Sequence, residues 1–130
     1  MADSLFTKII KGEIPAFKIY EDAKTYAFLD IHPKTPGHVL VVPKAQVDQF
    51  MDLADEDYQA LMATVKKVAR RLREVLKAPR IGVEIIGVDV PHAHIHVFPF
   101  ATMAEFRRVV DMSAEPDHDA LASMAKKLAF

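Results

Sequence analysis

One long stretch of helical periodicity dominates this sequence. Between Asp55 and Leu76 apolar residues recur at spacings of three and four, which places them on one face of an α-helix. They are Tyr58, Leu61, Met62, Val65, Val68, Ala69, Leu72, Val75 and Leu76. Basic residues fall mainly between them, and we interpret these as a solvated helix face rather than a nucleic-acid patch. The pattern predicts the longest helix of the chain over 55–76.

Five shorter segments have strand-like patterns. They cover residues 17–20, 25–30, 39–42, 83–86 and 93–98. The first two form a predicted hairpin, the third is a predicted central strand because its apolar run is continuous, and a short connection makes the last two antiparallel neighbours. Ser4 and Gly12 are typical of the start and end of a short first helix. The short helices that we expect cover residues 5–10, 103–110 and 117–128.

The composition narrows the classes of protein to which the chain can belong. Its 130 residues are 51% hydrophobic, enough for one buried core, so we expect a single domain over 1–130. The formal charge of -1 gives no broad cationic field, so nucleic acid is not an expected partner. The lack of cysteine excludes disulfides and thiolate metal sites. No long uncharged stretch follows Met1, so we expect a cytoplasmic protein with no membrane span.

Three histidines, His92, His94 and His96, alternate with apolar residues just before Pro99. Side chains on a strand alternate between its faces, so the three rings are predicted to point one way, roughly 7 Å apart in succession, while the apolar residues face the core. Neighbouring imidazoles repel one another when they are protonated. The row therefore suits a site that binds an anion or transfers a proton.

The residues alone leave two kinds of chemistry open for this row. Alternate histidines on a strand can place two nitrogens on one zinc ion, and Asp30, Asp89 or His38 can supply a further ligand or carboxylate. Alternatively, one neutral imidazole attacks a phosphorus atom while its neighbours donate hydrogen bonds to the phosphate oxygens or a proton to the leaving group. The second mechanism uses the cluster more completely and needs no metal.

The segment His92–Phe98 has the order histidine, apolar, histidine, apolar, histidine, apolar, apolar, which resembles the motif of the histidine triad (HIT) family. Leu5–Pro15 (LFTKIIKGEIP) resembles the opening segment of that family. Phe28–Pro33 (FLDIHP) and Pro36–Lys44 (PGHVLVVPK) resemble its nucleotide-binding strands. The resemblance covers a core of about residues 5–100 and leaves residues 101–130 as a C-terminal extension.

The resemblance implies an α+β fold. Its antiparallel sheet of about five strands carries one long helix, and short helices lie near the chain ends. The resemblance further implies a homodimer in which one sheet runs across both subunits. The implied ligand is a purine nucleotide or a nucleotide conjugate, and we expect no metal or other cofactor.

By the same resemblance, His94 is the nucleophile, His96 contacts the α-phosphate and assists the leaving group, and His92 orients the nucleophile. Asp30 is implied to accept hydrogen bonds from the ribose hydroxyls, as a carboxylate can. His38 either lies near the triad or fixes its loop by a hydrogen bond. The residues implied to wall the base pocket, each of which also fits an ordinary core, are Leu5, Phe6, Ile9, Ile14, Phe28, Leu29 and Ile31.

The chain departs from the family pattern in several places. Gln46 stands where many phosphoramidase-type members carry a histidine. The approach to the triad, 86–91, is short and lacks the glutamine and the hydroxyl residue that usually contact the phosphate side; Asp89 within it must point away from a phosphate or bind a cation. The stretch from residue 102 onward matches no pattern. We expect His32 and His118 to be surface residues.

Together these observations predict a hydrolase or transferase that acts on the α-phosphate of a purine nucleoside monophosphate derivative. The derivative is a phosphoramidate or a dinucleoside polyphosphate, and the reaction passes through a nucleotidyl group on His94. Two alternatives remain. One is a non-enzymatic, nucleotide-binding regulatory dimer, and the other is a metal-dependent hydrolase with the histidines as ligands.

Overall fold

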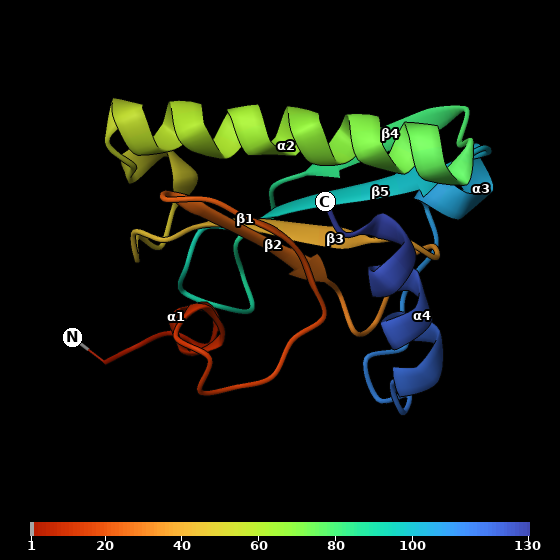
Figure 1. Cartoon of the computed structure of the whole chain (residues 1–130), viewed down its shortest axis with the longest axis horizontal. Coiled ribbons are helices and arrows are strands. Elements are labelled where there is room, and N and C mark those ends of the chain that lie inside the picture. Colours follow the sequence, from red (N-terminus) through yellow and green to blue (C-terminus); the bar gives the residue numbers. More distant parts are fainter. Residues whose placement is uncertain (1) are drawn as a thin grey trace.

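The computed structural model describes residues 2–130 and contains a five-stranded sheet with the order β1-β2-β3-β5-β4 (Figure 1). The elements are α1 (Leu5–Ile10), β1 (Lys18–Glu21), β2 (Thr25–Leu29), β3 (Val39–Pro43), a 3-10 turn (Phe50–Asp52), α2 (Asp55–Leu76), β4 (Arg80–Glu84), β5 (Ile95–Phe100), α3 (Met103–Phe106) and α4 (His118–Leu128). All neighbouring strands are antiparallel. The α+β fold expected from the resemblance is therefore confirmed.

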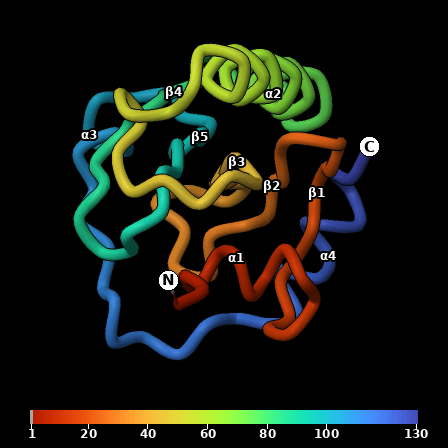
Figure 2. Tube along the Cα trace, turned by 90° about the vertical axis from the view of Figure 1, so that its left-hand side faces the viewer, coloured from red at the N-terminus to blue at the C-terminus, as the bar shows by residue number. Residues whose placement is uncertain are grey.

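The helix α2 has the bounds that its periodicity predicts, and it covers one face of the sheet (Figure 2). Its buried side chains join a core with alternate residues of the central strands, which are Ala27, Leu29, Val39, Val41, Ile95 and Val97. The intervening strand residues face the other way and pack against α1. That second cluster consists of Phe6, Ile9, Tyr26, Phe28, Leu40 and Val42. The sheet thus lies between two apolar layers, and His96 belongs to the α1 side because it pairs directly with Leu40.

Local polar groups fix the first helix and the hairpin as the sequence indicates. The Ser4 hydroxyl accepts a hydrogen bond from the backbone N–H of Thr7 at 3.0 Å and so caps α1. In the hairpin turn, the Asp22 carboxylate accepts bonds from the backbone N–H groups of Lys24 (3.0 Å) and Thr25 (2.8 Å). These hydrogen bonds stabilise α1 and the β1–β2 hairpin, which are both short.

The structure shifts two predicted strands along the chain and shortens one predicted helix. The fourth strand covers Arg80–Glu84 rather than 83–86, and the fifth covers Ile95–Phe100 rather than 93–98. In the β4–β5 pair, Arg80 lies opposite Phe100 and Glu84 lies opposite His96. Pro99 lies beyond the part of β5 that pairs with β3, so its missing N–H breaks no hydrogen bond to β3. The helix expected over 103–110 ends at Phe106.

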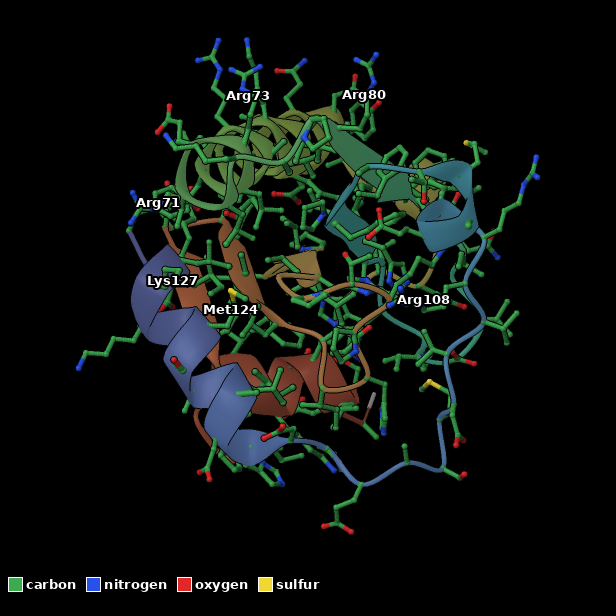
Figure 3. The ribbon with its side chains drawn as sticks, turned by 90° about the vertical axis from the view of Figure 1, so that its right-hand side faces the viewer. Arg71, Arg73, Arg80, Arg108, Met124 and Lys127 are labelled. Carbon is green, nitrogen blue, oxygen red and sulfur yellow. The ribbon has the colours of Figure 1, made fainter. Side chains whose placement is uncertain are left out.

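The C-terminal segment returns to the main body of the protein. The guanidinium of Arg71 on α2 donates hydrogen bonds to the carbonyl oxygens of Leu128 (2.9 Å), Ala129 (3.1 Å) and Lys127 (3.4 Å). Figure 3 shows Arg71 at the same end of α4 as Lys127. Arg71, interpreted from the sequence as part of a solvated face, therefore holds the end of α4. Within residues 2–130, no helix is both long and apolar enough to cross a membrane.

Candidate active site

A cavity of about 360 Å³ lies between α1 and the sheet, within the usual size range of small-molecule sites. The site residues proposed from the sequence that line it are Leu5, Phe6, Ile9, Ile14, Phe28, Leu29, Asp30, Ile31, His94 and His96. The structure thus brings together residues from three stretches of the chain, 5–14, 28–31 and 94–96. His38 and His92 are outside the lining and contact His96 and His94 instead. A larger, shallower hollow of about 540 Å³ beside β1 has no histidine in its lining.

Other residues line the cavity that the sequence did not assign to the nucleotide site. They are Pro15, Ala16, His32, Leu40, Asp89, Val90 and Met112. His32 was expected at the surface, but it is half-buried, and its Nε2 lies 3.1 Å from the carbonyl oxygen of Ala114. Strand alternation with Phe28 could have identified Leu40. No local pattern pointed to Met112, because the C-terminal segment reaches the cavity only through the tertiary fold.

The triad does not form the evenly spaced row along one strand face that strand periodicity predicted. β5 begins at Ile95, so only His96 lies on the strand, and the backbone N–H of His92 closes a turn by donating to the carbonyl of Val90 at 2.8 Å. His92 is 0% exposed and His94 is 5% exposed. The rings of His94 and His96 remain neighbours, with centroids 5.3 Å apart. The sequence identified the cluster correctly, but the turn moves its first member into the interior.

Hydrogen bonds determine which nitrogen of His94 is free. The Nδ1 atom lies 2.8 Å from the backbone carbonyl oxygen of His92. A carbonyl oxygen only accepts, so Nδ1 carries the proton and the lone pair of the neutral ring is on Nε2. Because His94 lines the cavity, this nitrogen is the candidate nucleophile.

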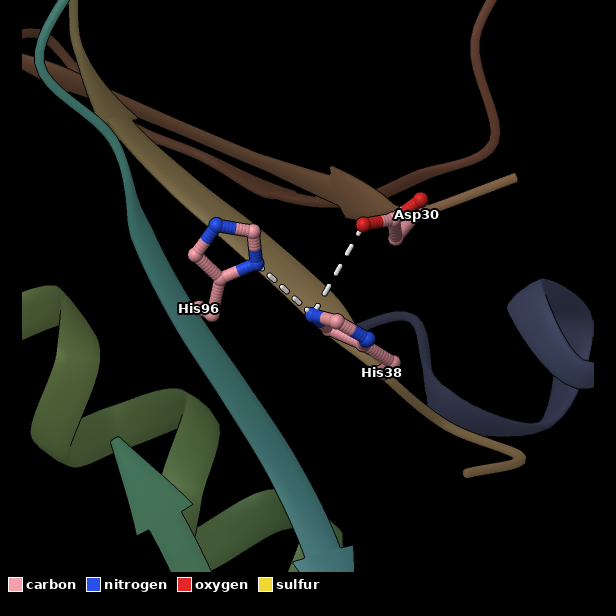
Figure 4. A group of neighbouring side chains, drawn as sticks. All are labelled: Asp30, His38 and His96. Carbon is pink, nitrogen blue, oxygen red and sulfur yellow. Dashed lines mark hydrogen bonds and ion pairs between the residues drawn. The ribbon is translucent and has the colours of Figure 1, made fainter. Parts of the chain in front are cut away.

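A second chain of hydrogen bonds sets the tautomer of His96 (Figure 4). The backbone N–H of Lys34 donates to Nδ1 of His38 at 2.9 Å, so the proton of the neutral His38 ring is on Nε2. This N–H donates to Nδ1 of His96, also at 2.9 Å. The neutral ring of His96 then carries its proton on Nε2, where it can donate to a ligand. The prediction that His38 lies near the triad is confirmed by this contact.

The turn before β3 holds His38 in place. Gly37 has φ 96°, a conformation that favours glycine, and a Cβ atom there would come within 2.7 Å of the Leu76 side chain. The hydroxyl of Thr35 donates to the carbonyl of Pro99 at 2.6 Å, and the backbone N–H of Asp30 donates to the carbonyl of His38 at 2.9 Å. The same turn therefore positions His38 and the candidate ribose ligand Asp30.

Burial keeps these histidines neutral. It lowers the pKa of His38 to about 3, with further lowering by the neighbouring His96 and Lys34. The pKa of His96 is lowered to about 4, chiefly by burial and then by the electrostatic repulsion that protonated His96 would meet from a protonated His94. Burial also lowers the pKa of His92 and raises that of the Asp30 carboxyl. Burial thus favours the neutral form of His38, His92 and His96, the three rings around the candidate nucleophile.

Asp30, His38 and His96 are the described residues that could hold a metal ion, since one ligand atom of each lies within 4.8 Å of the others. Their hydrogen bonds oppose this use. The lone pair of His38 Nδ1 is taken by the Lys34 N–H, so His38 Nε2 carries a proton where a metal would bind. The Asp30 carboxylate is 3.7 Å from the same nitrogen. This group is better explained as a hydrogen-bonded chain than as a metal site.

Fold and site together define a class of small α+β protein in which an apolar cavity ends at a cluster of histidines. The family model described as HIT domain matches residues 11–103. The chain is also 34% identical over 132 residues to adenosine 5'-monophosphoramidase HNT1 of Saccharomyces cerevisiae, an alignment that covers 98% of this chain and 81% of the yeast protein. The chain belongs to the HIT family, as the sequence motif predicted.

Solved structures agree with this assignment. A Hit-like protein involved in cell-cycle regulation from Bartonella henselae has a TM-score of 0.85 at 29% identity, covering 97% of this chain and 93% of that one. A Zn-bound histidine triad family protein from Mycobacterium smegmatis has a TM-score of 0.73 at 30% identity, covering 95% and 94% of the two chains. The likeness extends over nearly the whole chain, including the C-terminal segment that no sequence motif identified.

Proposed function

We propose that this protein hydrolyses purine nucleoside phosphoramidates, compounds in which an amine is joined to the α-phosphate, through a covalent intermediate on His94. The observation that carries the proposal is the tautomer of His94, whose Nδ1 is bound to the His92 carbonyl while the ring lines the cavity. The similarity to a yeast adenosine 5'-monophosphoramidase supports the same activity.

The cavity has the chemistry that a nucleoside requires. Phe6, Ile9 and Phe28 provide apolar surface for a purine ring, with Phe6 edge-on to Phe28 at a centroid distance of 5.6 Å. Asp30 stands at the same wall, and its Oδ1 already accepts a bond from the backbone N–H of His32 at 2.9 Å. The remaining carboxylate oxygen is an acceptor for ribose hydroxyls. The ligand's phosphate then lies towards His94 and His96.

In the first step, the lone pair of His94 Nε2 forms a bond to phosphorus as the bond from phosphorus to the leaving nitrogen breaks. The amine leaves with that electron pair and takes a proton from His96. His96 can supply it as an imidazolium, because a phosphate anion beside the ring raises its pKa from the low value of the free site. In this form Nδ1 also carries a proton, which replaces the hydrogen bond that this atom accepts from His38 in the free site. Water then attacks phosphorus and returns a proton to His96, and the bond to His94 breaks to release the nucleoside monophosphate.

The leaving group is proposed to be an amine because of the charges beside His96. A second hollow of about 200 Å³ adjoins the cavity there, and its carboxylates are Asp30, Glu84 and Asp89. Lys34 forms an ion pair with Glu84 at 3.0 Å, and Arg108 is the other cation in the lining. Asp89 lines both hollows, so a polyphosphate leaving group would meet a like charge.

The test is incubation with an adenosine phosphoramidate, followed by intact-mass detection of a nucleotidyl adduct and by measurement of AMP release. We expect wild type to release AMP and to form the adduct transiently, and His94→Ala to do neither. His118→Ala is the matched control, since this exposed histidine on α4 is outside the cavity lining. Equal AMP release by wild type and His94→Ala would contradict the proposal.

The two alternatives give different results in the same assay. A regulatory nucleotide-binding protein would bind AMP tightly but form no product across a panel of substrates. A metal-dependent hydrolase would retain stoichiometric zinc through dialysis and lose its activity when a chelator is added. The hydrogen bonds of His38 disfavour the metal alternative.

We also propose that the protein acts as a homodimer through β4. This strand is at one edge of the sheet, so one side of its backbone has no neighbouring strand within the described chain. Val83 on it and Ile85 and Ile86 just after it are 45%, 39% and 59% exposed. A second copy of β4 would cover both the backbone groups and these apolar side chains.

A further inference from the structure

Behind the cavity, four polar side chains from three distant segments meet at the start of α1. Ser4 and Thr7 belong to α1 and its cap, Gln46 follows β3, and His92 begins the triad. Ser4 is 7% exposed and His92 is 0% exposed. None of the four lines the cavity. Buried polar groups are costly unless they are paired, so the arrangement of their bonds is informative.

The bonds around His92 select one tautomer. Its Nε2 lies 2.8 Å from the carbonyl oxygen of Pro43, which can only accept, so Nε2 carries the proton. The neutral ring therefore has its lone pair on Nδ1, and the Ser4 hydroxyl donates to that atom at 2.7 Å. The Ser4 oxygen accepts a hydrogen bond from the Thr7 backbone N–H, so its own hydroxyl proton can be donated to Nδ1 of His92. Ser4 therefore favours the tautomer of His92 whose lone pair is on Nδ1.

Gln46 fixes the segment that carries Ser4. Its Oε1 accepts hydrogen bonds from the backbone N–H of Ser4 at 2.8 Å and from the hydroxyl of Thr7 at 2.7 Å. Its Nε2 donates to the carbonyl of Ala2 at 2.9 Å. One amide group thus joins three points of the N-terminal segment to the end of β3.

The arrangement extends to the candidate nucleophile. The carbonyl of His92 accepts the Nδ1 proton of His94, and the backbone N–H of Ala93 donates to the carbonyl of Val47, next to Gln46, at 2.7 Å. The ring of Phe6 lies edge-on to both His92 and His94, with centroids 5.7 and 5.0 Å away. A shift of His92 would therefore displace the group that orients His94.

We propose that Ser4, Thr7 and Gln46 form an N-terminal clamp that holds His92 in one tautomer and position, and so aligns Nε2 of His94 for attack. These are positioning residues, since they act through His92. The effect on turnover rests on the proposed role of His94, whereas the tautomer of His92 can be observed without any substrate.

The experiment compares Ser4→Ala, Ser4→Asp and Ser4→Thr by steady-state kinetics, thermal unfolding and ¹⁵N chemical shifts of the His92 and His94 rings. Aspartate still caps a helix but only accepts hydrogen bonds, so Ser4→Asp keeps the cap while it favours a protonated His92. Threonine keeps the hydroxyl donor. The matched control is Asp3→Asn, which removes the exposed ion pair with Lys11 but no bond of the clamp.

We expect kcat to fall about tenfold to a hundredfold in Ser4→Ala and Ser4→Asp, with KM little changed, because only alignment is lost. In both variants the ¹⁵N chemical shifts of the His92 ring should move away from those of the Nε2–H tautomer. In Ser4→Asp they should move towards the values of the imidazolium. Ser4→Thr and Asp3→Asn should retain wild-type kcat and shifts. Unchanged His92 shifts and kcat in both Ser4→Ala and Ser4→Asp would overturn the clamp. An inactive wild type with the expected shifts would contradict the proposed function but support the clamp's effect on His92.

Discussion

The ring of His38 connects the turn before β3 with the triad. It accepts from the Lys34 backbone and donates to His96, so it is held neutral in a site where it is 4% exposed. The sequence could place this histidine only near the triad or in a loop hydrogen bond, and the structure shows both. The sequence identified the chemical groups, but not which nitrogen of each ring carries its proton, because that depends on partners in other segments.

Neutral burial of His38 predicts a stability that falls at acidic pH. The pKa is about 3 in the folded protein and 6.5 when unperturbed, so between these values the unfolded chain binds more protons and folding becomes less favourable as the pH falls. From about pH 6 to about pH 5, wild type should lose about 1.2 kcal/mol more unfolding free energy than His38→Gln. Urea titrations at several pH values measure this. His118→Gln should keep the wild-type slope, and equal slopes for wild type and His38→Gln would contradict the prediction.

The charge of Asp89 is expected to influence which leaving group the protein prefers. Replacing it by asparagine removes a like charge from the wall shared by the two hollows. The ratio of kcat/KM for a dinucleoside polyphosphate to that for a phosphoramidate should rise about fivefold to tenfold, because Asp89 is exposed and two like charges in a well-hydrated site repel by about 1 kcal/mol. Asp119→Asn, an exposed change on α4, should leave the ratio unaltered. A ratio unchanged in Asp89→Asn would show that this carboxylate does not contact the leaving group.

Among the elements, α2 was predictable to the residue, whereas the ends of β4 and β5 were not. A helix of this length repeats its apolar pattern many times, and each repeat confirms the phase. The strand β4 contains Gly82, against which the Phe98 ring packs so closely that a Cβ atom would come within 2.7 Å of it. A small residue that is required by packing across strands gives no strand signal of its own.

The docking of α4 on α2 predicts a specific role for Arg71. Removing its bonds to the C-terminal carbonyls in Arg71→Ala should lower the free energy of unfolding by about 1–2 kcal/mol. Hydrogen exchange should increase in α4 while the sheet remains protected. Arg70→Ala, a change at an exposed neighbour, should alter neither. If exchange in α4 stayed at the wild-type rate in Arg71→Ala, the contact would not be needed for docking.

At the level of the whole molecule, the exposed edge at β4 predicts the oligomeric state. Wild type should sediment as a dimer, and Ile86→Lys should be monomeric because a buried unpaired cation opposes association. Val109→Lys is the matched control, since Val109 is 92% exposed and lies in the C-terminal segment. A dimeric Ile86→Lys protein would exclude this edge as the interface, and a monomeric wild type would contradict the dimer itself.

Local pattern was enough for α1, α2 and α4, the hairpin, the central strand and the presence of a histidine cluster, because each depends on residues that are close in the chain. The HIT resemblance added the roles of Asp30 and His94, which remain proposals. The burial of His92, its bond to Ser4 across 88 positions and the approach of Met112 to the cavity followed only from the folded chain. Such contacts depend on how distant segments pack, and the spacing of residues along one segment carries no information about its distant partner.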